Sequence, residues 1–161
     1  MVVARLCLVE LSTGILFPTL FTIILSSAPR FSCHPGSVMV GSSVVVCDGV
    51  GWNTTKPACL AAPHPPSLAV IVDSLQVDNP AVSVGEEVTL ACHGLGGNPA
   101  PTVALYMNGR RVGEEGMFSS AYTFIAGQHH DGARISCGAW NTFHQDTVYS
   151  LYQVLTIKCK C

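Results

Sequence analysis

The eight cysteines carry the most reactive side chains of this sequence, and their spacing limits what they can do. Cysteine thiolates bind zinc or attack substrates, and cysteines also pair as disulfides. The sequence has no Cys-x-x-Cys motif, and its closest pair, Cys159 and Cys161, has no neighbouring His or Cys that could complete four zinc ligands. The spacing therefore favours disulfides formed in an oxidising compartment, and no metal site is predicted.

Histidines and carboxylates are the other groups that could perform chemistry. Four histidines could bind a metal or act as an acid or base: His93, His129, His130 and His144. The adjacent pair His129 and His130 would face opposite ways on a strand, so the turn before Asp131 is the better place for it. No Ser–His pair lies in a nucleophile elbow, and no glycine-rich phosphate loop occurs. We therefore predict that the protein is not an enzyme and uses no cofactor.

Composition narrows the classes of partner. The net charge is −2, and Lys and Arg form no cluster that would attract a nucleic-acid backbone or an anionic membrane surface. Apolar residues make up 48% of the chain and charged residues 11%, with much of the apolar excess in the first 28 residues. We expect the partner to be an extracellular or cell-surface protein, with homophilic binding as one possibility, and not a nucleic acid.

Residues 1–28 predict a secretory leader. Arg5 precedes an apolar run without charge from Gly14 to Leu25, and the small residues 26–28 follow it. The run is short for a bilayer span, which needs about 20 apolar residues. We interpret it as a signal peptide or, alternatively, as a signal anchor that would tie the chain to a membrane. Either interpretation places the remainder outside the cell, secreted or on the extracellular face of the plasma membrane.

The segment 31–60 is rich in Gly, Pro and Cys and too short to fold without cross-links. Its run FSCHPGSVMVGSSVVVCDGVGWNTTKPAC resembles the second half of a sushi module, also called a complement control protein repeat. The resemblance implies a Cys33–Cys59 disulfide with Trp52 buried over it. Because the first half of the module is missing, the resemblance leaves Cys47 without its usual partner.

Three short segments outside the predicted strands also suggest specific roles: residues 53–55, 61–67 and 159–161. Asn53-Thr54-Thr55 is an Asn-x-Thr acceptor for N-glycosylation. Residues 61–67 are rich in proline and are interpreted as an extended, semi-rigid linker between domains. Residues 159–161 are interpreted as the start of a further module or as a tail, and Cys159 and Cys161 could alternatively form an intermolecular bridge.

Residues 68–158 alternate in the manner of one-faced strands. Val88, Leu90 and Cys92 alternate with Thr89 and Ala91. Similar strands are predicted at 103–107, 122–126, 133–139 and 148–157, and Asn108-Gly109 predicts a hairpin turn after the first of these. Short strands separated by turns favour a β-sandwich. An inward-facing Cys92–Cys137 disulfide would stabilise it by about 4 kcal/mol.

The runs VSVGEEVTLAC, NPAPTVALYMNG and DGARISCGAWN resemble the immunoglobulin superfamily, in particular adhesion-type domains such as those of nephrin. The resemblance implies an all-β protein: an immunoglobulin-like sandwich after a small, disulfide-rich partial sushi module and a hydrophobic signal segment. Two positions depart from the family pattern. Leu105 stands where a core Trp usually packs on the disulfide, and Ile135 replaces the corner Tyr, so the tyrosine-corner hydrogen bond is lost.

These features predict an extracellular binding protein that acts in cell adhesion or in cell-surface and immune recognition through its immunoglobulin-like domain. Alternatives are a secreted complement-regulator-like protein that binds through sushi modules, and a matrix spacer. Tyr, Arg and Phe are favoured anchors at protein interfaces. The candidate binding residues, on the front sheet and at the tip of the last hairpin, are Tyr106, Asn108, Arg110, Arg111, Asn141, Phe143 and His144.

Overall fold

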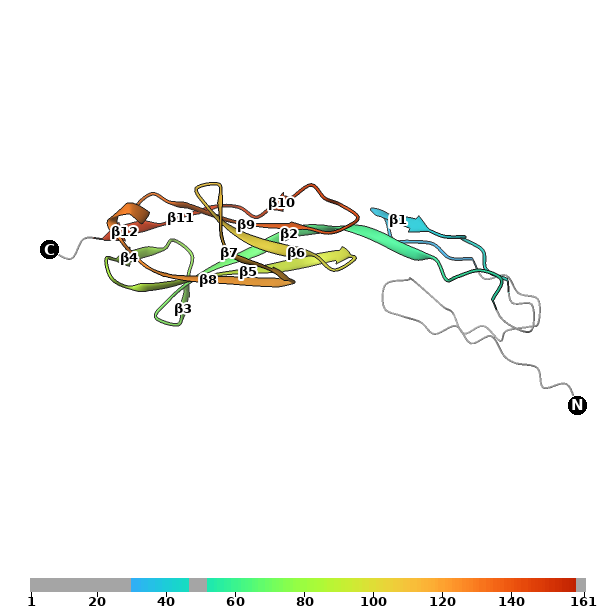
Figure 1. Ribbon diagram of the computed structural model, residues 1–161, viewed down its shortest axis with the longest axis horizontal. Helices are drawn as coiled ribbons and strands as arrows, with labels where there is room; N and C mark the ends of the chain where they lie inside the picture. The colour runs from blue at the N-terminus through green and yellow to red at the C-terminus, as the bar shows by residue number, and fades with distance from the viewer. Residues whose placement is uncertain (1–29, 47–51, 159–161) are drawn as a thin grey trace, which may run out of the picture. The chain divides into compact units, whose positions relative to one another are not determined.

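The computed structural model describes residues 30–46 and 52–158, which belong to two compact units divided between Ala61 and Ala62 (Figure 1). The predictions for the leader at 1–28 and for Cys47, Cys159 and Cys161 lie outside the described residues. Regular structure is almost entirely strand, which confirms the all-β prediction. Within the described ranges, no helix has the length and apolar character needed to cross a membrane.

The first unit holds a short antiparallel ribbon closed by a disulfide. Strand β1 (Ser37–Val40) pairs with the start of β2 (Ala58–Val72). Cys33 and Cys59 are bonded, with their Cα atoms 5.6 Å apart. Trp52, expected to be buried, is only half-buried. A unit of this size has too little apolar surface to enclose so large a ring. The Cys33–Cys59 disulfide therefore contributes much of the stability of its described part.

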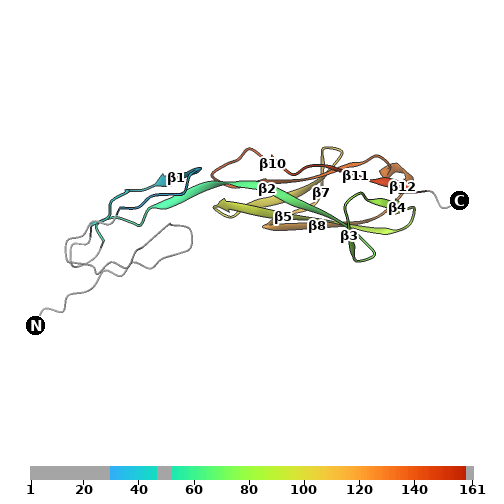
Figure 2. The ribbon, with the colours of Figure 1, turned by 180° about the vertical axis from the view of Figure 1, so that it is seen from behind.

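The second unit is a sandwich of two sheets (Figures 1 and 2). The back sheet contains β2, β3 (Leu75–Val77), β5 (Glu87–Asn98) and β8 (Ser119–Ile125). The front sheet contains β6 (Thr102–Met107), β7 (Arg110–Met117), β9 (Arg134–Trp140), β10 (Val148–Tyr149) and β11 (Gln153–Val154). A small parallel pair, β4 (Ala81–Ser83) with β12 (Thr156–Lys158), completes the unit.

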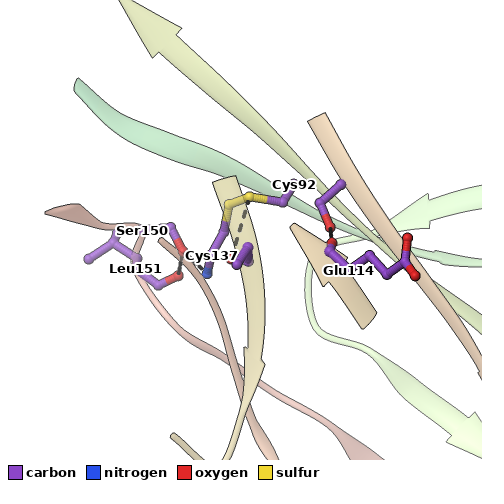
Figure 3. The surroundings of a disulfide bond; sticks show 7 residues. Cys92, Glu114, Cys137, Ser150 and Leu151 are labelled. Atoms are coloured by element: carbon purple, nitrogen blue, oxygen red, sulfur yellow. Dashed lines mark hydrogen bonds between the residues drawn. A yellow bond between two sulfur atoms is a disulfide. The ribbon is translucent and has the colours of Figure 1, made fainter. Parts of the chain in front are cut away.

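Alternation along the strands builds the core between the two sheets. Val88, Leu90 and Cys92 of β5 are fully buried, and Cys137 of β9 faces them from the front sheet. Cys92 and Cys137 are bonded across the sandwich, with Cα atoms 5.7 Å apart (Figure 3). The two apolar replacements of the family pattern also lie in this core: Leu105 and Ile135. The predicted sandwich is therefore confirmed, with leucine and isoleucine filling positions that the family gives to larger rings.

The hairpin between β6 and β7 follows the predicted turn. Asn108 and Gly109 have φ angles of 52° and 76°, the left-handed backbone that this two-residue turn requires. The side-chain Oδ1 of Asn108 also accepts the Arg134 N–H at 2.9 Å, and the Asn108 N–H donates to the Arg134 carbonyl at 2.8 Å. The turn is thus fixed to β9 as well as to its own strands.

The segment 61–67, interpreted from sequence as a linker, lies within β2. Pro63 and Pro66 are buried, and the end of β5 approaches them closely. Gly97, with φ 84°, brings its backbone so near that an added Cβ would lie 3.2 Å from Pro63 Cα. Proline-rich and β conformations are both extended, so a sequence suited to a spacer also continues as a strand when a neighbouring backbone comes close.

The predicted final strand at 148–157 is instead three short strands, β10, β11 and β12. Ser150 breaks the ladder, because its side chain takes a place normally held by a backbone carbonyl. Its Oγ accepts the Cys137 N–H at 3.0 Å and donates to the Leu151 carbonyl at 2.8 Å. A side chain that competes for ladder hydrogen bonds in this way interrupts a strand, and the apolar residues around it gave no sign of the interruption.

Gln153 offers a first prediction. It pairs with the buried Ile135, and its side-chain Oε1 is buried without a hydrogen bond from any described residue. A buried acceptor without a donor costs about 1–3 kcal/mol. We expect Gln153→Met, which keeps the length and removes the polar atom, to raise the free energy of unfolding by about 1 kcal/mol in urea titrations. Gln145→Met, at an exposed loop position, is the control and should change nothing; an equal gain there would contradict the prediction.

Candidate functional site

The outward face of the front sheet is the candidate site. Since Leu105 and Cys137 point into the core, their neighbours in the strands point outward. Tyr106 of β6 lies opposite Ser136 of β9 on one side and opposite Arg111 of β7 on the other. Tyr149 of β10 lies opposite Gly138. Alternation in four neighbouring strands therefore brings two tyrosines and an arginine to one face.

Tyr106 and Tyr149 form an edge-to-face pair, with ring centroids 5.4 Å apart. The pair lies on Gly138, which has no side chain to hold it away from the sheet. A Cβ built there would come within 3.0 Å of Tyr106 Cε2 and 3.2 Å of Tyr149 Cε1. Aromatic pairs of this geometry contribute about 0.5–1.5 kcal/mol beyond the area that they bury. The glycine thus leaves room for both rings to pack edge to face against the sheet, and we call this pair the aromatic platform.

Charge surrounds this platform. Burial, followed by the neighbouring Tyr149, raises the pKa of Tyr106 above its ordinary value of 10.0, further from the physiological range in which the phenol is already protonated. Arg111 forms an ion pair with Glu115, and both side chains are about half exposed. A surface ion pair of this kind adds little stability. Its guanidinium is therefore accessible to a partner's carboxylate at small cost.

The interruption at Ser150 projects two further apolar side chains. Leu151 is 92% exposed and Tyr152 is 59% exposed. Hydrogen bonds of Ser150 fix the backbone next to them. The Ser150 N–H donates to the Cys137 carbonyl at 2.8 Å. The Ser150 hydroxyl accepts the Cys137 N–H and donates to the Leu151 carbonyl (Figure 3). Arg134 places its guanidinium carbon 5.3 Å from the Tyr152 ring centroid, a cation–π contact.

We call these residues the front-sheet surface: Tyr106, Arg111, Arg134, Tyr149, Leu151 and Tyr152. Its charge differs from that of the unit around it. Residues 62–158 contain eight Asp and Glu against four Lys and Arg, and all three arginines of that range lie on front-sheet strands β7 and β9. Tyr and Arg are the residue types most enriched among interface anchors. The surface is therefore rich in residue types that are common at protein interfaces.

The structure divides the predicted binding residues between the two ends of the front sheet. Tyr106, Asn108, Arg110 and Arg111 lie at or beside the β6–β7 turn. Arg110 is exposed but pairs with Met107 at the turn, apart from the aromatic pair, and Asn108 is used to fix that turn. The other predicted residues belong to the loop after β9, at the opposite end of the same strands: Asn141, Phe143 and His144.

Asn141 is a correction, because it is 2% exposed and cannot contact a partner. Its Nδ2 donates to the Pro99 carbonyl at 2.9 Å, and its Oδ1 accepts the backbone N–H groups of Phe143 and His144 at 3.1 and 2.7 Å. The amide thus holds the loop closed from inside. Phe143 is 38% exposed and His144 is partly buried, so both remain near the surface but away from the aromatic pair.

Four residues of the front-sheet surface were not predicted: Arg134, Tyr149, Leu151 and Tyr152. Arg134 could have been found, because it alternates with the inward Ala133 and Ile135. The other three lie in a run where apolar residues occur at nearly every position, so alternation does not separate inward from outward side chains. Tyr149 is placed by its pairing with Gly138, and Leu151 and Tyr152 follow the interruption of the ladder at Ser150.

His129 and His130 lie in the 3₁₀ turn η1 (Gln128–His130), near the turn position predicted for them. Their rings are 3.9 Å apart, and the His130 ring packs on Phe124 at 4.6 Å. His130 Nδ1 accepts the Gly127 N–H at 3.0 Å. Among the described residues, no group of three or more His, Cys, Asp or Glu side chains is placed to hold a metal ion. The pair is therefore a structural element of the turn.

This pair predicts a pH effect on stability. Burial, and then the charge of His129, lower the pKa of His130 from its ordinary value of 6.5. The unfolded chain therefore binds more protons than the folded one in the window below pH 6.5, so the stability contribution is complete above that pH and is lost as the pH falls. We expect the urea midpoint to fall between about pH 7 and about pH 5. His130→Gln should reduce this slope; an unchanged slope in that variant would contradict the assignment.

Comparison with known proteins finds similarity in both parts of the chain. Residues 26–59 match the sushi repeat (SCR repeat) family. The chain is similar to the mouse nectin-like molecule 4 ectodomain (Ig1–Ig3), with 24% identity over 62% of this chain and 35% of that one and a TM-score of 0.46. It is also similar to the titin M10–obscurin-like 1 Ig complex (19% identity, 63% and 99% covered, TM-score 0.42) and to Rst D1–D2 (17%, 84% and 80%, TM-score 0.43).

The chain spans about a third of the nectin-like ectodomain that it matches. The fold of its second unit is given by its own two antiparallel sheets and by the disulfide that joins them. Residues 26–59 are thus similar in sequence to a sushi repeat, and the unit that follows is a disulfide-linked β-sandwich of the immunoglobulin-like fold.

Proposed function

We propose that this protein is an extracellular recognition module that binds a protein partner through the front-sheet surface. One observation carries the proposal: the Tyr106–Tyr149 pair and the Arg134–Tyr152 contact lie on the front sheet, and Leu151, next to Tyr152 in the chain, is 92% exposed. Large apolar side chains in solvent mark interaction sites when they gather in one patch. The rigid rings lose little conformational entropy on binding, which favours affinity.

Sushi repeats and immunoglobulin-like domains are typical of extracellular adhesion and recognition proteins, and the two disulfides fit that compartment. We propose secretion or display on the extracellular face of the plasma membrane, a role in adhesion or cell-surface recognition, and no enzymatic activity. We also propose the domain limits 31–60 for the sushi part and 68–158 for the sandwich. Recognition is assigned to the second unit, because the aromatic pair lies there.

The experiment is a binding screen. The full chain, secreted and tetramerised, is tested against an array of cell-surface ectodomains that includes the chain itself, so that homophilic binding is one possible result. A Tyr149→Ala and Leu151→Ala double variant should lose at least tenfold in affinity, since each anchor contributes about 1–2 kcal/mol. Leu75→Ala, 70% exposed on β3 of the back sheet, is the matched control. Equal loss in the control, or none in the double variant, would refute this assignment.

A further inference from the structure

The turn at residues 52–55 of the first unit holds an asparagine in a fixed position on the surface. The Asn53 N–H donates to the Val46 carbonyl at 2.9 Å, and the Val46 N–H donates to Asn53 Oδ1 at 2.8 Å. Asn53, Thr54 and Thr55 are all exposed. The two hydrogen bonds clamp both the backbone and the side-chain amide of Asn53 to Val46.

The clamp uses only one of the two polar atoms of the amide. Oδ1 is the acceptor, and Nδ2 makes no hydrogen bond to any described residue. Because Oδ1 and Nδ2 branch in different directions from the same carbon, fixing Oδ1 toward Val46 turns Nδ2 away from it. The nitrogen of this exposed residue is therefore turned away from Val46, while the oxygen holds the turn.

We propose that Asn53 carries an N-linked glycan whose attachment is compatible with this clamp. Asn-Thr-Thr meets the acceptor rule, because the middle residue is not proline. The donor is an oligosaccharide linked to a lipid diphosphate. Nδ2 forms a bond to the anomeric carbon of the first sugar and loses one proton, while the bond from that carbon to the diphosphate oxygen breaks and the lipid diphosphate leaves. No oxidant or reductant is needed.

The product keeps the hydrogen bonds that the folded turn requires. Substitution at Nδ2 leaves the side-chain carbonyl intact, so Oδ1 still accepts the Val46 N–H. Since the amide plane is already fixed, the first sugar leaves the surface in one direction. The glycan thus adds bulk to the exposed side of the turn without disturbing the hydrogen bonds beneath it.

The placement of the glycan bears on recognition, although the inference does not depend on the proposed function. The acceptor pattern Asn-x-Ser/Thr occurs once in the sequence, at Asn53. Asn108 and Asn141, the asparagines beside the front sheet, are followed by Gly-Arg and Thr-Phe and are not acceptors. The front-sheet surface therefore carries no N-linked sugar of its own, whereas the turn around Asn53 is covered.

The test is mass analysis of the full chain made in animal cells. The chain is expressed once with its native residues 1–28 and once with a foreign signal sequence in their place, and both medium and cell extract are examined. We expect a glycopeptide containing Asn53 that peptide N-glycosidase converts to the peptide with Asp at this position. Unmodified Asn53 in the chain behind the foreign signal would overturn the proposal, since translocation is then assured.

Matched variants separate the acceptor from the clamp. Thr55→Ala removes the acceptor hydroxyl and leaves Asn53 and Val46 bonded, so all glycan should be lost. Thr54→Ala changes the adjacent exposed threonine but preserves Asn-x-Thr, so the glycan should remain. Thr55→Ser should also keep it. Retention of the glycan in Thr55→Ala, or its loss in Thr54→Ala, would overturn the assignment of this residue.

Discussion

Replacing Cys92 and Cys137 together by alanine lowers the free energy of unfolding of the second unit by about 4 kcal/mol. The reason is chain entropy, because the bond closes a loop between residues 45 positions apart and the reduced chain regains that freedom when it unfolds. Both sulfur atoms are buried at the centre of the core, so the variant also loses packing. A loss of this size is a large part of the stability of a typical domain, about 5–15 kcal/mol.

The measurement is guanidinium unfolding followed by the fluorescence of Trp140, in a Trp52→Phe background so that only the second unit reports. The matched control replaces Cys33 and Cys59, which close a loop in the first unit. That control should leave the Trp140 transition where it was. If the Cys92/Cys137 variant unfolds at the same denaturant concentration as its parent, the bond is not a main support of the sandwich.

Leu105→Ala is expected to cost about 3 kcal/mol in the same assay, within the range found when a buried leucine is truncated. Leu105 is fully buried and pairs with Cys137 in the β6–β9 ladder, so the missing methyl groups leave a cavity beside the disulfide. Packed strands on both sides prevent the core from collapsing into that space.

Leu151→Ala serves as the control for this truncation, since it removes the same atoms from a side chain that is 92% exposed. It should change stability by less than about 0.5 kcal/mol. Equal effects at the two positions would show that Leu105 does not act as a core residue. The proposal that Leu105 fills the core position of the family's tryptophan would then be contradicted.

Strands with one buried face were predictable from the alternation of apolar and polar residues. A strand without that alternation, such as β7, was not. In residues 88–92 of β5, in 103–105 of β6 and in 135–139 of β9, every second residue is apolar and buried, so alternation predicted both the strands and their inward side. Strand β7 has the sequence RRVGEEGM, with no apolar alternation, and forms because the Asn108-Gly109 turn returns the chain alongside β6. Local preference alone does not specify such a strand.

The candidate site was also predictable only in part, namely where its residues lie on alternating strands or on a strand placed by a turn. Tyr106 and Arg111 follow from alternation and from the turn that pairs their strands. Asn141 was wrongly taken as a surface residue, because a polar side chain in a loop is usually solvated, whereas this one satisfies three backbone groups from within. Leu151 and Tyr152 depend on a side-chain hydrogen bond of Ser150, which no periodic pattern encodes.

The short, interrupted edge formed by β10 and β11 also has a consequence for solubility. Each strand has only two residues, and the chain between them departs from the ladder at Ser150. An incoming strand from another molecule would find no continuous row of free amide and carbonyl groups, and long unbroken rows are what edge-to-edge aggregation requires. The protein can therefore display a leucine and two tyrosines to solvent without offering them as the seed of a fibril.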